Sequence, residues 1–139
     1  MLPKPKRLTK KRDFLKLASQ GHTVFGPFAT LRIRQVPKKA TQVAFITSTK
    51  VFKKAVDRNR VKRRLREVIR ELWPELPAEM HLLFILKPEA LKAEWPALGE
   101  EVRRMLSRIP EALSRPAKPS SRALKQKAKM ARPKVTNVK

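Results

Sequence analysis

The sequence contains no cysteine and few acidic residues, and it has no long apolar run. Without cysteine, disulfide bridges and thiolate metal sites are both excluded. No stretch approaches the roughly eighteen consecutive apolar residues that indicate a membrane-spanning helix. The basic N-terminal residues are not followed by an apolar run of signal-peptide length, so we expect a cytoplasmic protein with no place in a membrane.

The scarcity of acids leaves a very large positive charge. The 139 residues include 35 Lys and Arg but only 11 Asp and Glu, which gives a formal net charge of +24. A small domain needs a net charge of only about 2 to 8 to stay in solution, and a larger excess disfavours the compact state unless a polyanion neutralises it. Nucleic acid is therefore the predicted partner. An anionic membrane surface is the weaker alternative, because no long basic helix shows the Trp, Phe and Leu face that such binding uses.

The uneven distribution of charge predicts the domain organisation. Residues 67–111 hold nine of the eleven acids, whereas residues 114–139 hold nine cations and no acid. This last segment is rich in Pro, Ser, Ala and Lys, and it cannot bury enough apolar surface to offset the entropy lost on ordering. We predict one nucleic-acid-binding α-β domain over residues 1–113 and a basic tail, disordered when free, over residues 114–139.

Hydrophobic periodicity predicts an α+β fold. Leu31 and Ile33 alternate with Arg32 and Arg34, which indicates a strand with one solvated face. The predicted order is a helix ended by Gly21, a strand after a break at Gly26 and Pro27, a more buried strand over 43–51, a basic helix from Ala55 to before Pro74, a buried strand over 81–86, and a helix over 94–109. Helices packed on a small mixed sheet give a two-layer α-β sandwich.

The basic helix contains the most informative segment, "AVDRNRVKRRLRE". On a helical wheel, five apolar residues form one continuous stripe that can anchor the helix to the sheet: Val61, Leu65, Val68, Ile69 and Leu72. An adjacent arc that contains no acid carries Asn59, Lys62, Arg63, Arg66 and Arg70. Glu67 and Glu71 fall on the far side, where they can pair with Arg60 and Arg64.

We interpret the acid-free arc as a phosphate-binding surface. Arginine presents a planar fork of donors to phosphate oxygens, and Asn59 adds a donor and an acceptor for a sugar or base edge. The alternative is a merely solvated charged face. That alternative is disfavoured because so many neighbouring cations are costly without an anion.

The ordered features of this chain resemble the protein subunit of bacterial ribonuclease P. "RNRVKRRLRE" is similar to the RNR signature of that family. The rest of the pattern also agrees over roughly residues 4–109: Arg7-Leu8, then Asp13-Phe14 in a helix that ends at Gly21, an apolar strand over 43–48, a Lys-rich loop over 50–54, and the strand "LLFILKP".

The resemblance implies a fold and a function. The fold is a sandwich with an unusual left-handed β-α-β crossover, similar to a domain found in a small-subunit ribosomal protein. The function is that of a ribonuclease P subunit, which binds the catalytic RNA and assists it in removing the 5′ leader from precursor transfer RNA. Catalysis, with magnesium ions, belongs to the RNA, so no catalytic residue, no metal site and no small-molecule cofactor is expected in this chain.

The resemblance also implies two RNA-binding surfaces. The first comprises the RNR helix and its loop: Arg58, Asn59, Arg60, Lys62, Arg63, Arg66 and Arg70, with Lys50, Lys53 and Lys54. The second is a cleft for the single-stranded leader, between the first helix and the sheet: Phe14, Ala18, Ala29, Leu31, Thr47 and Ala55, with Lys50 at its rim. Typical members carry aromatic residues where this chain has Ala18 and Leu31. Because base stacking on an aromatic is worth about 1 to 3 kcal/mol, we expect this chain to bind the leader more weakly, or to bind it more through phosphate contacts.

Two other functions remain open at this point. A ribosomal or other structural RNA-binding protein would also use a basic helix and a basic tail. A DNA-binding helix module is disfavoured, because no second helix lies at turn spacing and no dimer seam is apparent. His22 and His81 lie far apart in the sequence without paired acids, so the chain shows no catalytic arrangement of its own.

Overall fold

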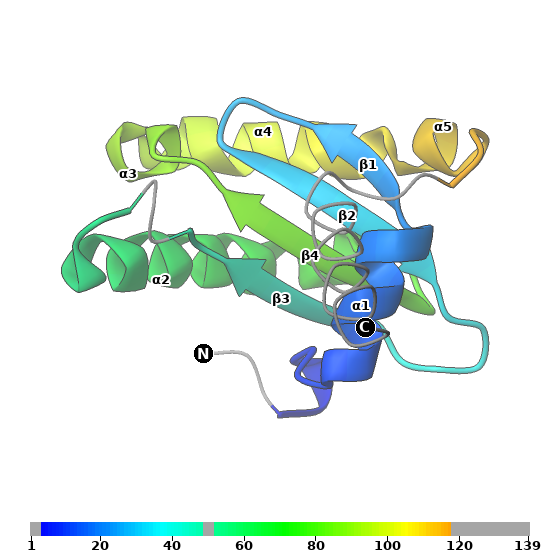
Figure 1. Ribbon diagram of the computed structural model, residues 1–139. Coiled ribbons are helices and arrows are strands. Elements are labelled where there is room, and N and C mark those ends of the chain that lie inside the picture. Colours follow the sequence, from blue (N-terminus) through cyan, green and yellow to red (C-terminus); the bar gives the residue numbers. More distant parts are fainter. Residues whose placement is uncertain (1–3, 49–51, 118–139) are drawn as a thin grey trace, which may run out of the picture.

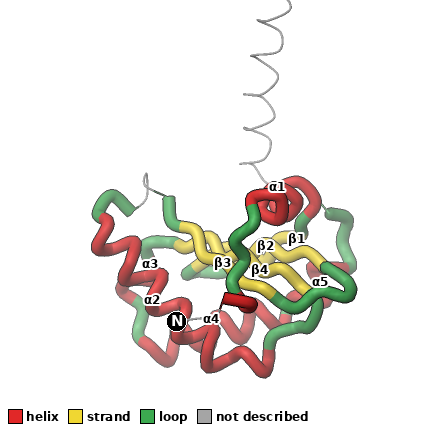
Figure 2. Tube along the Cα trace, turned by 90° about the horizontal axis from the view of Figure 1, so that it is seen from below, coloured by secondary structure: helices red, strands yellow, loops and turns green. Residues whose placement is uncertain are grey.

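The chain folds around one four-stranded sheet with helices on both faces (Figure 1). This computed structural model describes residues 4–48 and 52–117. Helix α1 lies on one face of the sheet, and the later helices lie on the other (Figure 2). The elements are η1 (Lys4–Lys6), α1 (Lys11–Gln20), β1 (His22–Phe25), β2 (Ala29–Gln35), β3 (Gln42–Ile46), α2 (Ala55–Leu72), η2 (Trp73–Glu75), β4 (Met80–Leu86), α3 (Glu89–Lys92), α4 (Trp95–Ser107) and α5 (Ile109–Leu113).

The sheet is mixed, with the strand order β1-β2-β4-β3. Strands β1 and β2 form an antiparallel hairpin, β2 is antiparallel to β4, and β3 is parallel to β4. Helix α2 connects these two parallel neighbours across the face opposite α1 (Figures 1 and 2). The crossover is left-handed, whereas nearly all β-α-β connections are right-handed. The predicted α+β sandwich of helices on a small mixed sheet is confirmed.

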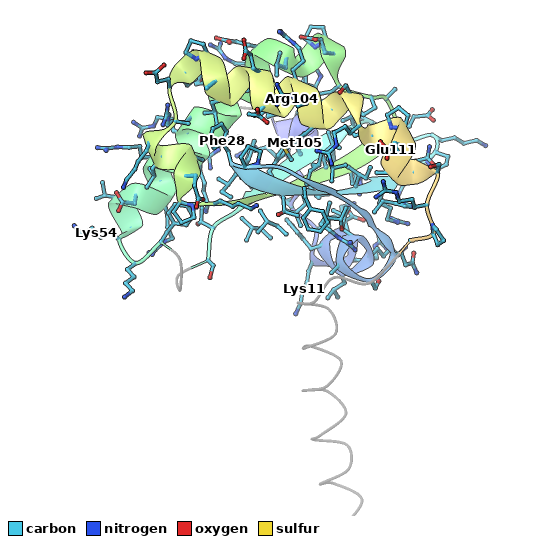
Figure 3. The ribbon with its side chains drawn as sticks, turned by 90° about the horizontal axis from the view of Figure 1, so that it is seen from above. Lys11, Phe28, Lys54, Arg104, Met105 and Glu111 are labelled. Carbon is cyan, nitrogen blue, oxygen red and sulfur yellow. The ribbon has the colours of Figure 1, made fainter. Side chains whose placement is uncertain are left out.

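The main core lies between the sheet and helices α2 to α5. Strand β4 is buried along almost its whole length because it is an interior strand with a helical layer on each face. Met105 of α4 points toward the sheet (Figure 3) and is 2% exposed. The fully enclosed side chains of this core are Leu31, Ile33, Val61, Leu65, Ile69, Leu82, Phe84 and Leu98.

A smaller core lies under α1, and it contains an unexpected buried cation. Leu17 of α1 packs against Ala44 and Leu83 of the sheet. Arg32 of β2, expected on a solvated face, is only 3% exposed. Its guanidinium donates to the carbonyl oxygens of Leu17 and Ala18 at 2.7 and 3.0 Å. The prediction for Arg32 is wrong because α1 lies over that face and its last carbonyl groups accept from the arginine.

The structure refines several predicted elements. Residues 22–25 form a strand of their own that pairs with β2, so the break at Gly26 and Pro27 is the turn of a hairpin. The basic helix spans Ala55–Leu72, as expected. The helix predicted over 94–109 is α4, and a short additional helix, α5, follows it with Pro110 in its first turn. The final described helix ends at Leu113, and residues 118–139 of the predicted tail lie outside the described residues.

Candidate nucleic-acid interface

Helix α2 is held to the sheet by the apolar stripe that its sequence predicts. All five stripe residues are buried, with exposures from 0% to 6%: Val61, Leu65, Val68, Ile69 and Leu72. Packing this stripe fixes the rotation of the helix about its axis, and thereby fixes the direction of its polar residues. Asn59 and Arg63 are exposed, and Lys62 and Arg66 are half-buried.

Arg58, the first arginine of the RNR run, organises the loop that precedes the helix. Its guanidinium donates to the carbonyl oxygens of Phe52 and Lys53 at 2.7 and 3.3 Å. Phe52 itself is 2% exposed and anchors the loop in the main core. Lys53 and Lys54 lie between this anchor and α2 and are exposed, and Lys54 extends outward (Figure 3). Lys50 lies outside the described residues.

Arg64 points away from the predicted interface and fastens α3 to α2. It donates to the carbonyl oxygens of Ala90 and Leu91 at 2.8 and 2.7 Å, and also to that of Ala93. These carbonyl groups belong to the two middle residues of the four-residue helix α3 and to the residue just after it, where no further helical turn donates hydrogen bonds to them. The predicted pairing of Arg64 with a glutamate is therefore wrong.

The acid-free arc is shorter than its sequence predicts. Arg70 forms an ion pair with Glu67 at 2.9 Å, so the C-terminal end of the arc is partly neutralised. The ion pairs found in residues 4–48 and 52–117 involve none of Lys62, Arg63 and Arg66. We call Asn59, Lys62, Arg63 and Arg66 the cationic flank.

The sheet face shared with α1 is only partly covered by that helix. Two cross-strand rows lie side by side on it. Helix α1 packs over the row Thr23, Arg32, Leu83 and Ala44. The neighbouring row, which we call the open row, comprises Phe25, Thr30, Ile85 and Ile46.

The open row presents an aromatic side chain to solvent. Phe25 is 66% exposed, and Thr30, Ile85 and Ile46 are half-buried. Phe14, Ile46 and Ile85 all pack against the small core under α1, so the row borders that helix. Ala18 is half-buried on α1, one turn after Phe14. With strands about 4.8 Å apart, the row spans about 14 Å across the sheet.

Two residues predicted for the leader cleft lie on the opposite face. Ala29 and Leu31 are 1% and 0% exposed and belong to the main core. Because side chains alternate along a strand, Thr30 takes the place expected for them. The sequence contained this signal, since alternation already places Thr30 with Arg32 rather than with Leu31. Phe25 was missed because β1 was not recognised as a separate strand paired with β2.

A pocket of about 210 Å³ lies at the β3 edge of the sheet, between α1 and the cationic flank. It is lined by Phe14 of α1, Ala44 and Phe45 of β3, and Arg66 of the cationic flank, together with Arg7, Leu8, Thr9 and Val43. The N-terminal segment covers the start of the β3 edge, where the Leu8 N–H donates to the Val43 carbonyl at 2.9 Å. Thr47 is half-buried just after β3, and Ala55 is exposed at the start of α2.

The histidines do not form a catalytic arrangement. His81 of β4 is 1% exposed beneath α1. Burial lowers its pKa, the charge of Asp13 opposes that change, and Arg34 and Lys39 lower the pKa further. In the part of the chain that the structure describes, no three His, Cys, Asp or Glu side chains gather where they could hold a metal ion.

A sequence profile for ribonuclease P proteins matches residues 2–110 of this chain. The chain belongs to the ribonuclease P protein family. The ribonuclease P protein component of Synechococcus sp. strain JA-2-3B'a(2-13) is 40% identical over 112 residues, which cover 78% of this chain and 84% of the relative. The ribonuclease P protein component of Symbiobacterium thermophilum is 33% identical over 108 residues, covering 77% of this chain and 93% of the relative.

Solved ribonuclease P proteins share the fold. The protein from Thermotoga maritima superposes with a TM-score of 0.66 at 23% identity, covering 73% of this chain and 96% of that one. A Staphylococcus aureus mutant protein gives 0.67 at 20% identity, covering 75% and 87%. The predicted family and fold are therefore confirmed.

Membership of the family gives the chain its role. It is the protein component of ribonuclease P, an endoribonuclease of transfer RNA processing, and its partner is the ribonuclease P RNA. Catalysis belongs to that RNA. None of the helices within residues 4–48 and 52–117 is long and apolar enough to cross a membrane.

Proposed function

We propose that the two surfaces of this ribonuclease P protein hold two different RNAs. The cationic flank of α2 binds phosphates of the ribonuclease P RNA, and the open row binds the single-stranded 5′ leader of precursor transfer RNA. The observation that carries the proposal is the open row itself. It is a solvent-facing stripe across four strands with an aromatic residue, Phe25, at one end.

The composition of the open row suits an extended single strand. A base can stack on Phe25, which is 66% exposed, and such stacking tolerates any sequence because every base has a π face. Thr30 offers a hydroxyl, and Ile46 and Ile85 offer an apolar floor. The loop with Lys53 and Lys54 follows β3 and supplies cations for the leader's phosphates.

The pocket at the β3 edge supports the placing of the two RNAs. It brings Phe14 and Arg66 to a common cavity, so a strand that leaves the open row past Phe14 meets the cationic flank. A leader on the sheet face would thus remain next to the RNA that catalyses its removal.

Magnesium and location complete the proposal. We assign the magnesium ions to the RNA, where they would supply the chemistry of phosphodiester hydrolysis, because catalysis in this family belongs to that RNA. The cytoplasm, where transfer RNA precursors are processed in bacteria, is the proposed location.

The proposal is tested by restoring an aromatic residue beside the open row. Ala18→Phe adds a second stacking platform one turn from Phe14 on α1. In the reconstituted holoenzyme, precursor transfer RNA should bind more tightly by up to about 1 to 3 kcal/mol, the value of one stacked base. Mature transfer RNA, which lacks the leader, should bind with unchanged affinity. An equal gain for both RNAs, or no gain for either, would place the leader elsewhere.

A further inference from the structure

A second pocket lies at the C-terminal end of α2, outside both proposed RNA surfaces. It has a volume of about 470 Å³ and is formed by residues from three separate segments, 5–6, 39–41 and 73–79. Trp73 provides its aromatic wall, and Lys6 and Lys39 are its two cations. Glu79 is the one acid in its lining. The pocket therefore combines an indole ring, apolar surface and positive charge.

The walls of this pocket are tied together by hydrogen bonds between distant parts of the chain. The Thr41 hydroxyl donates to the Pro77 carbonyl at 2.6 Å. The Gln42 amide donates to the Pro5 carbonyl at 3.2 Å. These bonds hold the three segments around one space, so the fold itself defines the shape of the pocket.

The backbone beside the pocket adopts a costly conformation. Within residues 4–48 and 52–117, only Lys38 and Glu79 combine a side chain with a positive φ, at 68° and 54°. Glu79 lines the pocket, and Lys38 precedes Lys39, which also lines it. Left-handed conformations of non-glycine residues are uncommon, and strained backbone of this kind gathers at ligand sites.

Trp73 is half-buried and lines the pocket beneath a cation. The Lys6 ammonium lies over the indole ring, 4.6 Å from its centroid. Other parts of Trp73 pack against the main core, which holds the ring in place. A flat group that enters the pocket can take the position of the ammonium over the ring, and Lys6 can then bind an anion next to it.

Trp73 continues the line of the cationic flank. It has helical backbone angles, φ −51° and ψ −43°, so the path of α2 extends through it. Arg66, Arg70 and Trp73 are therefore spaced at i, i+4 and i+7, the positions that share one helix face. At 1.5 Å per residue, about 10 Å of helix separates Arg66 from Trp73.

We propose that this pocket binds one unpaired base of the RNA that lies along α2. The base stacks on Trp73, and Lys6 and Lys39 bind the adjacent phosphates. The inference rests on the contact of α2 with the ribonuclease P RNA, and it adds a base-binding site at the end of a surface that otherwise recognises phosphates. RNA is favoured over a peptide because the pocket's cations belong to a chain of net charge +24.

The first test uses the fluorescence of Trp73. The chain has two tryptophans, so Trp95→Phe leaves Trp73 as the only one. A five-nucleotide oligoadenylate added to this full-length variant should quench the emission saturably. An abasic oligomer with the same phosphates should bind without comparable quenching, and Lys6→Ala with Lys39→Ala should weaken the quenching. Equal quenching by both oligomers, or none by either, would overturn the proposal.

The second test measures affinity for the ribonuclease P RNA. Trp73→Leu keeps an apolar side chain against the core but cannot stack a base, so affinity should fall by about 5-fold to 100-fold, the equivalent of one stacked base. The salt dependence should stay unchanged, because stacking releases no counterions. Trp73→Phe should recover most of the affinity, and Trp95→Leu is the matched control without effect.

The outcomes separate this inference from the proposal on which it rests. If Trp73→Leu binds the RNA as tightly as the wild type while charge removal at Arg66 still lowers the salt slope, the base pocket is excluded and the phosphate surface stands. If Trp73→Leu lowers the melting temperature and Trp73→Phe restores stability without affinity, the role of Trp73 is structural and the proposal is wrong.

Discussion

Arginine side chains on α2 have two distinct roles, and their position around the helix decides which. Arg58 and Arg64 donate to backbone carbonyl oxygens of the protein itself. Arg63 and Arg66 take part in none of the ion pairs of the described residues and face the proposed RNA. A guanidinium cannot lose its charge in a protein and carries five donors, which suits both roles. Some arginines of this helix therefore stabilise the fold, and others are available to bind RNA.

We predict that Arg64→Gln destabilises the fold. The substitution leaves the carbonyl groups of Ala90, Leu91 and Ala93 without their donor, and the cost of an unsatisfied, partly buried polar group is about 1 to 3 kcal/mol. Urea unfolding should show a lower midpoint with an unchanged slope. Arg60→Gln, on an exposed position of the same helix, is the matched control and should leave the midpoint in place. Equal midpoints for the two variants would show that Arg64 does not anchor α3.

His81 makes the stability of the fold depend on pH. Burial beneath α1 lowers its pKa, although Asp13 opposes the change and Arg34 and Lys39 add to it. The folded chain therefore resists a proton that the unfolded chain binds at its ordinary pKa of about 6.5. The free energy of unfolding should fall as the pH drops through that value and should continue to fall toward the folded pKa.

This prediction is checked by urea unfolding of the wild type and His81→Leu between about pH 7.5 and 5.5. As the pH falls, the unfolding free energy of the wild type should decrease more than that of His81→Leu. Parallel pH profiles would show that His81 does not resist protonation in the folded state.

At the scale of elements, local patterns in the sequence predicted the helices and strands well, but contacts between elements could not be read from them. The apolar stripe of α2 follows from helical periodicity and is confirmed, and strand periodicity correctly places Leu31 and Ile33 in the main core. The burial of Arg32 depends on carbonyl groups of α1 that lie fourteen and fifteen residues away in the sequence. Arg64 likewise bonds to a segment 26 to 29 residues away.

For the candidate site too, residues within one element were predicted correctly, and residues brought together from several elements were not. The cationic flank was predictable because it lies on a single helix, and only its end at Arg70 was misjudged. The cleft required the register of four strands, so Ala29 and Leu31 were placed on the wrong face and Phe25 was overlooked. A surface built from one element can be predicted from periodicity, whereas one built from several requires the topology.

We predict that the two sides of α2 differ in their electrostatic contribution to RNA binding. Arg63→Gln and Arg66→Gln should each lower the slope of log affinity against log salt by close to one unit, about the value for one lost phosphate contact. Arg60→Gln, on the other side of the helix, should change the slope less. Affinity for the ribonuclease P RNA is measured over a series of salt concentrations. Equal changes in slope for all three variants would contradict a directional RNA surface.

At the scale of the whole molecule, the left-handed crossover places the RNR helix and the open row on opposite faces of one sheet. Helix α2 lies on the face opposite α1 (Figure 2), and the open row lies on the α1 face. Around the edge of β3, a pocket lined by Phe14 and Arg66 lies between the two faces. In the proposed arrangement, the protein contacts the ribonuclease P RNA on one face and the precursor transfer RNA on the other.

The central claim is that the open row holds the leader, and the most direct measurement removes its exposed aromatic residue. Dissociation constants of precursor and mature transfer RNA are compared for holoenzymes that carry the wild type, Phe25→Ala or Leu15→Ala, the last being a control at another exposed apolar residue. Phe25→Ala should weaken precursor binding by about 1 to 3 kcal/mol and leave the binding of mature transfer RNA unchanged. The dissociation constant of mature transfer RNA divided by that of the precursor should therefore fall toward one. A ratio equal to that of the wild type and of Leu15→Ala would contradict the claim.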